Sequence, residues 1–242
     1  MKTAAVIVIG NEILSGKVTE SNAGYLSKEL RDLGVDLRRI EIVPDEVDKI
    51  AHAVSIASDE FDYVFTSGGV GPTHDDVTMR GIAEALDVGI ERNEDFEETM
   101  RKFYGGSINE YILRMADLPA GSSLLWEDDL PIPVICARNI YVFPGEPGLL
   151  KKKFQAIRSR FRSEPYFLHK IFTTLEEGDI AKILEEAAEA HPAVQIGSYP
   201  VYSRKVDYRV QVTIESKDEN EAREVTDFLK GCIPAETILR VE

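Results

Sequence analysis

A glycine-rich segment with two adjacent carboxylates is the part of this chain best suited to chemistry. Residues 66–78 read Thr-Ser-Gly-Gly-Val-Gly-Pro-Thr-His-Asp-Asp-Val-Thr. An apolar run precedes the segment and a helical pattern follows it, so backbone N–H groups at the turn are expected to face an anion. Asp75 and Asp76 add oxygen ligands that suit a divalent cation beside that anion. The pattern predicts a phosphate and metal site; a strand-to-helix turn with an aspartate N-cap is the alternative.

The order of strand and helix patterns along residues 1–165 predicts how this segment is positioned. Strands are expected at residues 4–9, 37–43, 63–66, 134–137 and 139–143, the last two as a hairpin. Helices are expected from about residue 21 to Gly34, at 47–58, 80–86, 95–103 and 109–115, and from 149, with a turn at 117–122. Such alternation is typical of a parallel sheet with helices on both faces, whose ligands bind at the carboxyl ends of the strands.

Other polar residues follow predicted strands and are expected at the same edge of the sheet. They are Asn11, Glu12 and Asp45, and a second loop with Gly145 and Pro147 also follows a strand. Ordinary turn chemistry is the alternative for that second loop. The only basic concentration is Lys151 to Lys153 with Arg158, Arg160 and Arg162, for which a solvated helix face is the favoured interpretation and an anionic ligand the alternative.

Composition excludes several classes of protein. The 242 residues are 43% hydrophobic, enough for a sizeable core, and the net charge of −15 argues against a nucleic-acid partner. The apolar N-terminus is too short for a signal peptide, and no run approaches the roughly 20 residues of a membrane span. Cys136 and Cys232 match no metal or redox spacing. We therefore expect a cytoplasmic protein with reduced cysteines and no membrane partner.

The motifs resemble a known family. Residues 9–14 read Ile-Gly-Asn-Glu-Ile-Leu, residues 43–47 read Val-Pro-Asp-Glu-Val, and residues 143–147 read Phe-Pro-Gly-Glu-Pro. Together with residues 67–78 they resemble, in order, the molybdopterin-binding (MoaB/Mog-like) domain of the CinA competence/damage-inducible family. The C-terminal part, with Ile-Gly-Ser-Tyr-Pro at 196–200 and Tyr-Arg-Val-Gln-Val at 208–212, most resembles the molybdopterin-binding-like domain of eukaryotic FAD synthases.

The resemblance implies an α/β fold. It would consist of a three-layer, parallel-sheet MoaB/Mog-like domain at residues 1–165 and a small α+β domain at 166–242. The small domain is expected to have strands at 169–175, 194–198, 206–216 and 237–241 and helices at 178–190 and 219–233. Proteins of this fold commonly form dimers or trimers, so a homo-oligomer is expected.

The implied activity is metal-dependent hydrolysis of the diphosphate in ADP-ribose, FAD or a similar dinucleotide, with release of AMP. No amidase or adenylyltransferase domain of related proteins is recognised, so neither activity is expected. A pterin ligand, as in molybdenum-cofactor biosynthesis, is an alternative. Val70 stands where adenylyltransferases of this fold have a threonine, which weakens that alternative. The second alternative to the pyrophosphatase is a noncatalytic module that binds a nucleotide.

The chemistry assigns a part to each motif residue. The diphosphate is expected over the backbone amides of residues 67–71, while Asp76 and Asp45 bind the metal or the water beside it. Asp75 is either a third ligand or a helix cap. Carboxylates suit Mg²⁺ or Mn²⁺; the resemblance also admits Co²⁺, and K⁺ is a further candidate.

Several residues keep a structural alternative. His74 would donate to a phosphate, move a proton or hold the turn, and Glu12 would orient water or close the first turn. In the small domain, Tyr199 would stack on a base and Arg204 or Lys205 would contact phosphate, although packing or surface placement is favoured for all three. The expected catalytic residues are Glu12, Asp45, His74 and Asp76, and the expected metal ligands are Asp45, Asp75 and Asp76. The expected substrate-binding residues are Gly10, Asn11, Ser67, Gly68, Gly69, Gly71, Pro72, Thr73, Gly145 and Pro147.

Overall fold

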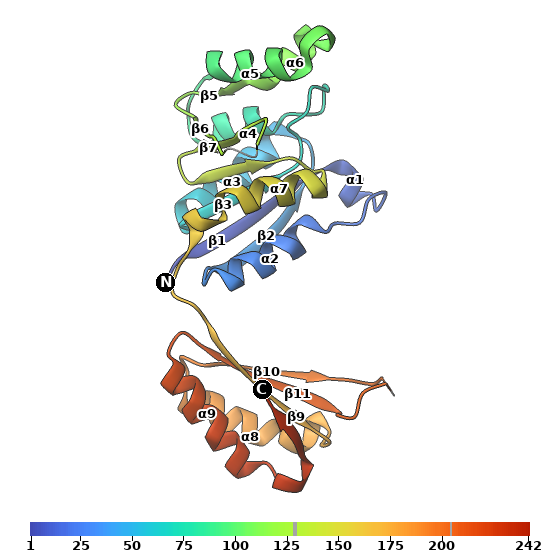
Figure 1. The fold of residues 1–242 in the computed structure, drawn as a ribbon, viewed down its shortest axis with the longest axis vertical. Coiled ribbons are helices and arrows are strands. Elements are labelled where there is room, and N and C mark those ends of the chain that lie inside the picture. Colours follow the sequence, from blue (N-terminus) through green and yellow to red (C-terminus); the bar gives the residue numbers. More distant parts are fainter. Residues whose placement is uncertain (128–129, 204) are drawn as a thin grey trace. The chain divides into compact units, whose positions relative to one another are not determined.

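The chain folds into two compact units, Met1–Ser163 and Glu164–Glu242 (Figure 1). The structure is a computed structural model that describes residues 1–127, 130–203 and 205–242. Sequence patterns place the boundary after residue 165, and the contacts place it after Ser163.

The N-terminal unit is built on a six-stranded sheet in the order β2-β1-β3-β8-β7-β6. Its strands are β1 (Thr3–Ile9), β2 (Asp36–Val43), β3 (Tyr63–Ser67), β6 (Ser123–Leu125), β7 (Val134–Ala137) and β8 (Ile140–Phe143). The first four strands in this order are parallel neighbours; Val6 of β1, for example, pairs with Ile40 of β2 and Phe65 of β3. β7 returns as the predicted hairpin with β8, and β6 pairs antiparallel with β7. The predicted parallel sheet is confirmed and carries an antiparallel extension.

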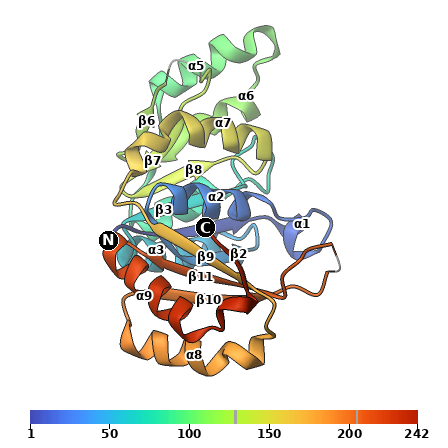
Figure 2. The ribbon, with the colours of Figure 1, turned by 60° about the horizontal axis from the view of Figure 1, so that its bottom comes forward.

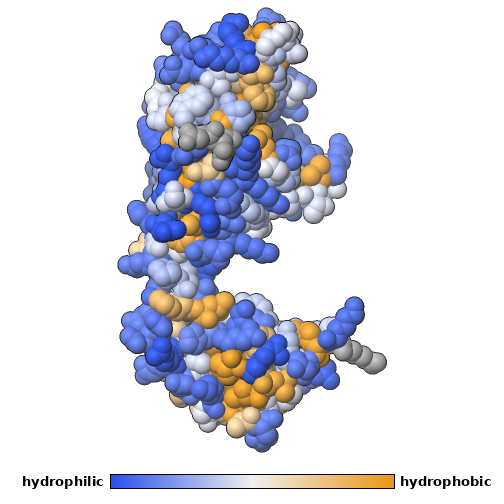
Figure 3. All heavy atoms as spheres, viewed as in Figure 1, coloured by the Kyte–Doolittle hydropathy of each residue, from blue (hydrophilic) through white to orange (hydrophobic). Residues whose placement is uncertain are grey.

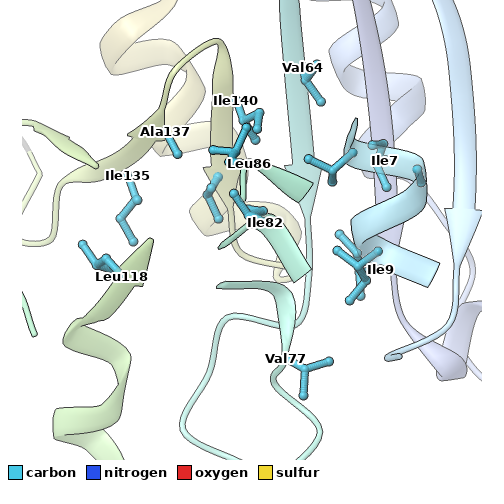
Figure 4. Packing of buried hydrophobic residues seen from close by; sticks show 14 of the residues in the cluster. Ile7, Ile9, Val64, Val77, Ile82, Leu86, Leu118, Ile135, Ala137 and Ile140 are labelled. Atoms are coloured by element: carbon cyan, nitrogen blue, oxygen red, sulfur yellow. The ribbon is translucent and has the colours of Figure 1, made fainter. Parts of the chain in front are cut away.

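Helices cover both faces of this sheet, which gives the predicted three layers. The α-helices described in this unit are α1 (Asn11–Leu14), α2 (Asn22–Asp32), α3 (Val47–Glu60), α4 (Thr78–Ala85), α5 (Glu94–Tyr104), α6 (Glu110–Leu113) and α7 (Pro147–Ile157). α2 and α7 pack on one face, and α3 and α4 on the other (Figure 1). On the α3 and α4 side, Ile7, Ile9 and Val64 of the sheet meet Ile82 and Leu86 (Figure 4). Because both faces of β1 are buried, the strand is a continuous run of Ala, Val and Ile.

Some short strands were not predicted from the sequence. β4 (Ile90–Arg92) and β5 (Asp117–Pro119) form a two-stranded antiparallel sheet. The prediction of a turn over residues 117–122 is therefore wrong for its first half, and the turn is confined to the residues that follow β5. Three residues are too few to show an alternating pattern, which is why these strands and β6 were not expected.

The C-terminal unit has the order β-α-β-β-α-β along the chain. Its elements are β9 (Phe167–Thr173), α8 (Glu177–Ala190), β10 (Gln195–Pro200), β11 (Val210–Ser216), α9 (Glu219–Cys232) and β12 (Ile238–Val241). The strands lie in the order β10-β11-β9-β12, all neighbours antiparallel, which is the ferredoxin-like arrangement. α8 and α9 pack on one face of this sheet (Figure 2). The predicted small α+β unit is confirmed, although β11 begins at Val210 rather than at residue 206.

The surface agrees with the acidic, polar composition. Hydrophilic residues cover most of the visible face of the N-terminal unit, while the visible face of the C-terminal unit also carries a broader group of apolar residues (Figure 3). Among the described residues, no helix is long and apolar enough to cross a membrane. Cys136 and Cys232 are free thiols, and burial raises the pKa of Cys136.

One member of the basic cluster is buried, contrary to the expected solvated face. The side chain of Lys153 on α7 is only 6% exposed, and its Nζ donates to the carbonyl of Pro133 at 2.5 Å. No carboxylate pairs with it among the described residues. Burial of the unpaired ammonium lowers the pKa of Lys153 from 10.5 to about 8.

We expect Lys153→Met to stabilise the N-terminal unit at pH 7 but hardly at pH 10.5. The folded state holds the neutral amine more readily than the unfolded chain does, so stability rises between pH 8 and 10.5 as the folded state loses its proton first. The pKa difference corresponds to about 3 kcal/mol at pH 7. Denaturant unfolding followed by the single tryptophan, Trp126, measures the difference. The exposed neighbour Lys152→Met is the control, and an equal effect of Lys153→Met at both pH values would contradict this account.

Candidate functional site

The carboxyl ends of the four parallel strands meet at one edge of the sheet, as the sequence predicts. The Gly10 N–H donates to the Val43 carbonyl at 3.2 Å, which joins the ends of β1 and β2. The Gly68 N–H donates to the Phe143 carbonyl at 3.1 Å, which joins the ends of β3 and β8. The loops that follow these strands are therefore held against one another.

At Gly68 the backbone after β3 lies very close to the end of β1 and to the loop after β8. Its φ is +107°, and a Cβ atom there would lie 2.1 Å from the carbonyl oxygen of Ile9. A Cβ on Gly145 would lie 3.4 Å from the Gly68 Cα, so the β8 loop passes directly over the same point. Only glycine combines this backbone conformation with this contact.

The glycine loop presents unsatisfied backbone donors. Gly69 also has a positive φ, +63°, and the chain turns there toward α4. The Thr78 N–H and hydroxyl fix the turn by donating to the carbonyls of Gly69 and Gly68. Within the described part of the chain, the N–H groups of Gly69, Val70 and Gly71 have no acceptor. Adjacent N–H groups in such a loop form a concavity that binds anions.

The two adjacent carboxylates are oriented by one threonine. Asp76 Oδ2 accepts from the Thr73 N–H at 2.8 Å and lies 2.6 Å from the Thr73 hydroxyl. That hydroxyl is also 2.5 Å from Asp75 Oδ1, and this contact lowers the pKa of Asp75. A Cβ on Gly71 would lie 2.7 Å from Asp76 Oδ2, so the carboxylate folds back over the loop. Both carboxylates therefore stand beside the free amides of the loop.

Asp45 has a different neighbour. Its Oδ2 accepts from the backbone N–H of Asn11 at 2.7 Å, at the first turn of α1. The carboxylate of Asp45, in the loop after β2, thus caps the short helix α1. A negative charge is favourable there because the N-terminus of a helix carries a partial positive charge. Asp45 follows β2 and Asp76 follows β3, with β1 between them.

The predicted metal ligands do not form a closed protein site. In the described residues, no three His, Cys, Asp or Glu side chains come together as a metal-binding group. Asp45, Asp75 and Asp76 therefore do not fit a resident ion held by protein alone. Asp75 and Asp76 do fit the usual mode of Mg²⁺, which takes one or two carboxylates together with substrate phosphates and water.

A hollow of about 370 Å³ opens beside the loop. Its lining includes the loop residues Gly69, Gly71, Pro72, Thr73, His74 and Asp76. It also includes Arg80 of α4 and Arg114, together with Met79, Ile90 and Met115. Neither Arg80 nor Arg114 has a carboxylate partner in the described residues. Asp117 also borders the hollow, but Arg92 binds it at 2.5 Å. In a chain with a net charge of −15, two unpaired guanidinium groups beside free amides favour an anionic ligand.

A second, smaller hollow of about 60 Å³ lies at the same edge of the sheet. Glu12, Ser67, Gly145 and Pro147 line it, together with Asn22. Asn22 is buried, and its Nδ2 donates to Ser67 Oγ at 2.9 Å and to the Gly145 carbonyl at 2.8 Å. Its Oδ1 is buried without a donor. Asn22 therefore fastens the β3 and β8 loops together and leaves one acceptor unsatisfied.

The remaining predicted residues have more local roles or surface positions. Pro147 is the first residue of α7, where Glu146 caps the helix and the backbone N–H groups lower the pKa of Glu146. Gly10 and Asn11 lead into α1 and border neither hollow. The His74 side chain is 98% exposed and lies 3.8 Å from Asp75. Tyr199 and Lys205 are exposed, as the favoured interpretation has it, and Arg204 lies outside the described residues.

Three residues of the site were not assigned a role from the sequence. Arg80 lies in the first turn of the helix after the glycine loop, and this position is a signal that sequence analysis could have used. Asn22 is a polar residue that begins an otherwise apolar helix face, which is a weaker signal. Arg114 reaches the hollow from a distant segment, and no local pattern indicates this.

Comparisons with known proteins agree with the motifs. Two family models match: the probable molybdopterin binding domain over residues 5–162, and the middle domain of FAD synthase over residues 165–242. A probable FAD synthase of Caenorhabditis briggsae is 32% identical over 95% of this chain, which spans only 49% of that protein. A protein of Archaeoglobus fulgidus is 34% identical over 90% of this chain and 92% of its own length.

A solved structure agrees with the fold. The crystal structure of CinA from Thermoplasma acidophilum is 30% identical, with a TM-score of 0.61, and covers 66% of this chain and 98% of its own. The predicted MoaB/Mog-like fold and the resemblance to CinA and FAD synthase are confirmed. The chain therefore belongs to the probable molybdopterin binding domain family, as a CinA-like member whose C-terminal unit matches the middle domain of FAD synthase.

Proposed function

We propose that this protein is a nucleotide pyrophosphatase that splits the diphosphate of ADP-ribose, FAD or a similar dinucleotide and releases AMP. The observation that supports it best is the hollow that joins the free N–H groups of Gly69, Val70 and Gly71 to the guanidinium groups of Arg80 and Arg114. A diphosphate has enough oxygens to accept hydrogen bonds both from the loop amides and from the guanidinium groups. Water attacks one phosphorus and the bond from that phosphorus to the bridging oxygen breaks. The bridging oxygen leaves with the other phosphate, so the products are AMP and a second phosphate monoester, and the proton released from water passes to the solvent.

The carboxylates of Asp75 and Asp76 imply that the reaction also needs a cation. A diphosphate on the loop amides would stand beside two carboxylates, and the repulsion between like charges would oppose binding. A divalent cation such as Mg²⁺, Mn²⁺ or Co²⁺, with K⁺ as a further candidate, would supply charge neutralisation at the phosphoryl oxygens. Thr73 holds the carboxylate of Asp76 over the loop, where it is the best placed group to hold such a cation or orient water.

A pterin is the second candidate ligand. The family model that covers residues 5–162 is described as a probable molybdopterin binding domain. The hollow also has apolar walls at Met79, Ile90 and Met115, which suit a flat ring. The relationship to FAD synthase favours a flavin or adenine nucleotide instead.

The test uses purified protein stripped of metal with EDTA. It is incubated separately with FAD and with ADP-ribose, each with Mg²⁺, Mn²⁺ or Co²⁺ and K⁺ present, and AMP is quantified by chromatography. Metal-dependent release of AMP supports the proposal and ranks the substrates. Binding of either nucleotide without AMP release would favour the noncatalytic module, and absence of both would favour a pterin ligand.

A further inference from the structure

A third hollow adjoins the proposed phosphate site and is lined in part by residues of the short helix α6. It measures about 520 Å³ and is lined by Pro72, Thr73, His74, Asn109, Tyr111, Ile112 and Arg114. Pro72, Thr73, His74 and Arg114 also line the hollow beside the glycine loop, so the two hollows share a wall. A ligand held by its phosphates at the loop can therefore extend over α6.

The wall of this third hollow carries an exposed aromatic ring. Asn109 caps α6, and its Oδ1 accepts from the N–H groups of Tyr111 and Ile112, both at 3.0 Å, which fixes the backbone under the ring. The Tyr111 side chain nevertheless remains 53% exposed. The guanidinium carbon of Arg114 lies 4.9 Å from the ring centroid. A fixed backbone, an exposed ring and an adjacent cation form a surface on which a flat heteroaromatic ring stacks well.

Arg114 connects this ring to the phosphate site. It borders both hollows, contacts Tyr111 and has no carboxylate partner in the described part of the chain. One guanidinium can therefore face a phosphate and flank a stacked ring, because its edge donates hydrogen bonds while its plane stacks.

Resting on the proposed function, we infer that Tyr111, Ile112 and Arg114 form the subsite for the planar ring of a nucleotide whose phosphates bind at the glycine loop. The recognised chemistry is a heteroaromatic ring joined through a ribose or ribityl chain to phosphate. Adenine and the flavin ring both have it, so the subsite determines the orientation of a dinucleotide and its preference among substrates.

The test compares ligands with and without a ring. AMP, FMN and inorganic pyrophosphate are titrated calorimetrically, in the presence of Mg²⁺, into the native protein and into Tyr111→Leu, Tyr111→Phe and Arg114→Gln. Tyr111→Leu should weaken binding of AMP, FMN or both by about tenfold or more, because stacking on the aromatic ring is lost, and leave pyrophosphate unchanged. Tyr111→Phe should restore the affinity, and Arg114→Gln should weaken all three ligands. The ring ligand that responds to Tyr111→Leu identifies the half that binds over α6.

Matched controls are exposed residues that line neither of these two hollows. Tyr202→Leu, in the C-terminal unit, and Arg101→Gln, on α5, should leave all three affinities unchanged. If Tyr111→Leu binds AMP and FMN as tightly as the native protein, the subsite is wrong, while binding of pyrophosphate still upholds the phosphate site. If the native protein binds none of the three, the proposed function and the subsite fall together.

Discussion

Replacement of Asp76 by asparagine is expected to abolish most turnover while leaving the glycine loop folded. Asparagine keeps a carbonyl oxygen that can accept from the Thr73 N–H and hydroxyl, so the hydrogen bonds at 2.8 and 2.6 Å survive the change. What disappears is the negative charge beside the bound diphosphate. Loss of one such electrostatic group typically lowers kcat by about 100-fold or more.

The measurement is metal-dependent release of AMP from the preferred dinucleotide, together with the affinity for AMP. We expect the affinity to change several-fold at most, because the amides of the loop and Arg80 and Arg114 remain in place. Asp59→Asn, an exposed change on α3, is the control for removal of one negative charge from the surface. Native turnover in Asp76→Asn would show that this carboxylate neither holds a cation nor orients water.

The sheet could be predicted because its signals are local and repeated. β1 and α3 show their structure in the type and spacing of apolar residues, and both are found where the pattern places them. β4 failed to show such a signal because all three of its residues are exposed, and α1 because it has only four residues. Elements of one turn or three residues are determined by the contacts around them rather than by their own pattern.

The candidate site divides in the same way. The glycine loop could be predicted because the turn, Thr73 and Asp76 lie within a few residues of one another. Arg114 could not, since it meets the loop only in the folded chain. Asp45 shows the limit of a motif: its position after β2 was predicted, but the motif did not reveal that its carboxylate caps α1.

Lys153 illustrates the same limit for charge patterns. Within three consecutive lysines, helix geometry turns one side chain into the core while its two neighbours stay exposed. A charge run therefore predicts a solvated face for most of its members but not for each.

Gly68→Ala is expected to damage stability and ligand binding together. A Cβ atom would lie 2.1 Å from the Ile9 carbonyl, so the ends of β1 and β3 must separate, and alanine is also strained at a φ of +107°. We expect the N-terminal unit to lose about 3 kcal/mol or more, by analogy with overpacking and strain at other special positions. Unfolding followed by Trp126 measures the stability, and calorimetry with pyrophosphate measures the site.

Gly16→Ala separates the two causes. Gly16 also has a positive φ, +71°, but a Cβ there meets nothing within 4 Å, so only the backbone strain of about 1 kcal/mol applies. The difference between the two variants therefore isolates the contact between the strand ends. If Gly68→Ala were no less stable than Gly16→Ala, the close approach of β3 to β1 would not hold the loop. The amides of Gly69, Val70 and Gly71 would then owe their positions to Thr78 and Asn22, which donate hydrogen bonds to the Gly68 carbonyl and to Ser67 Oγ.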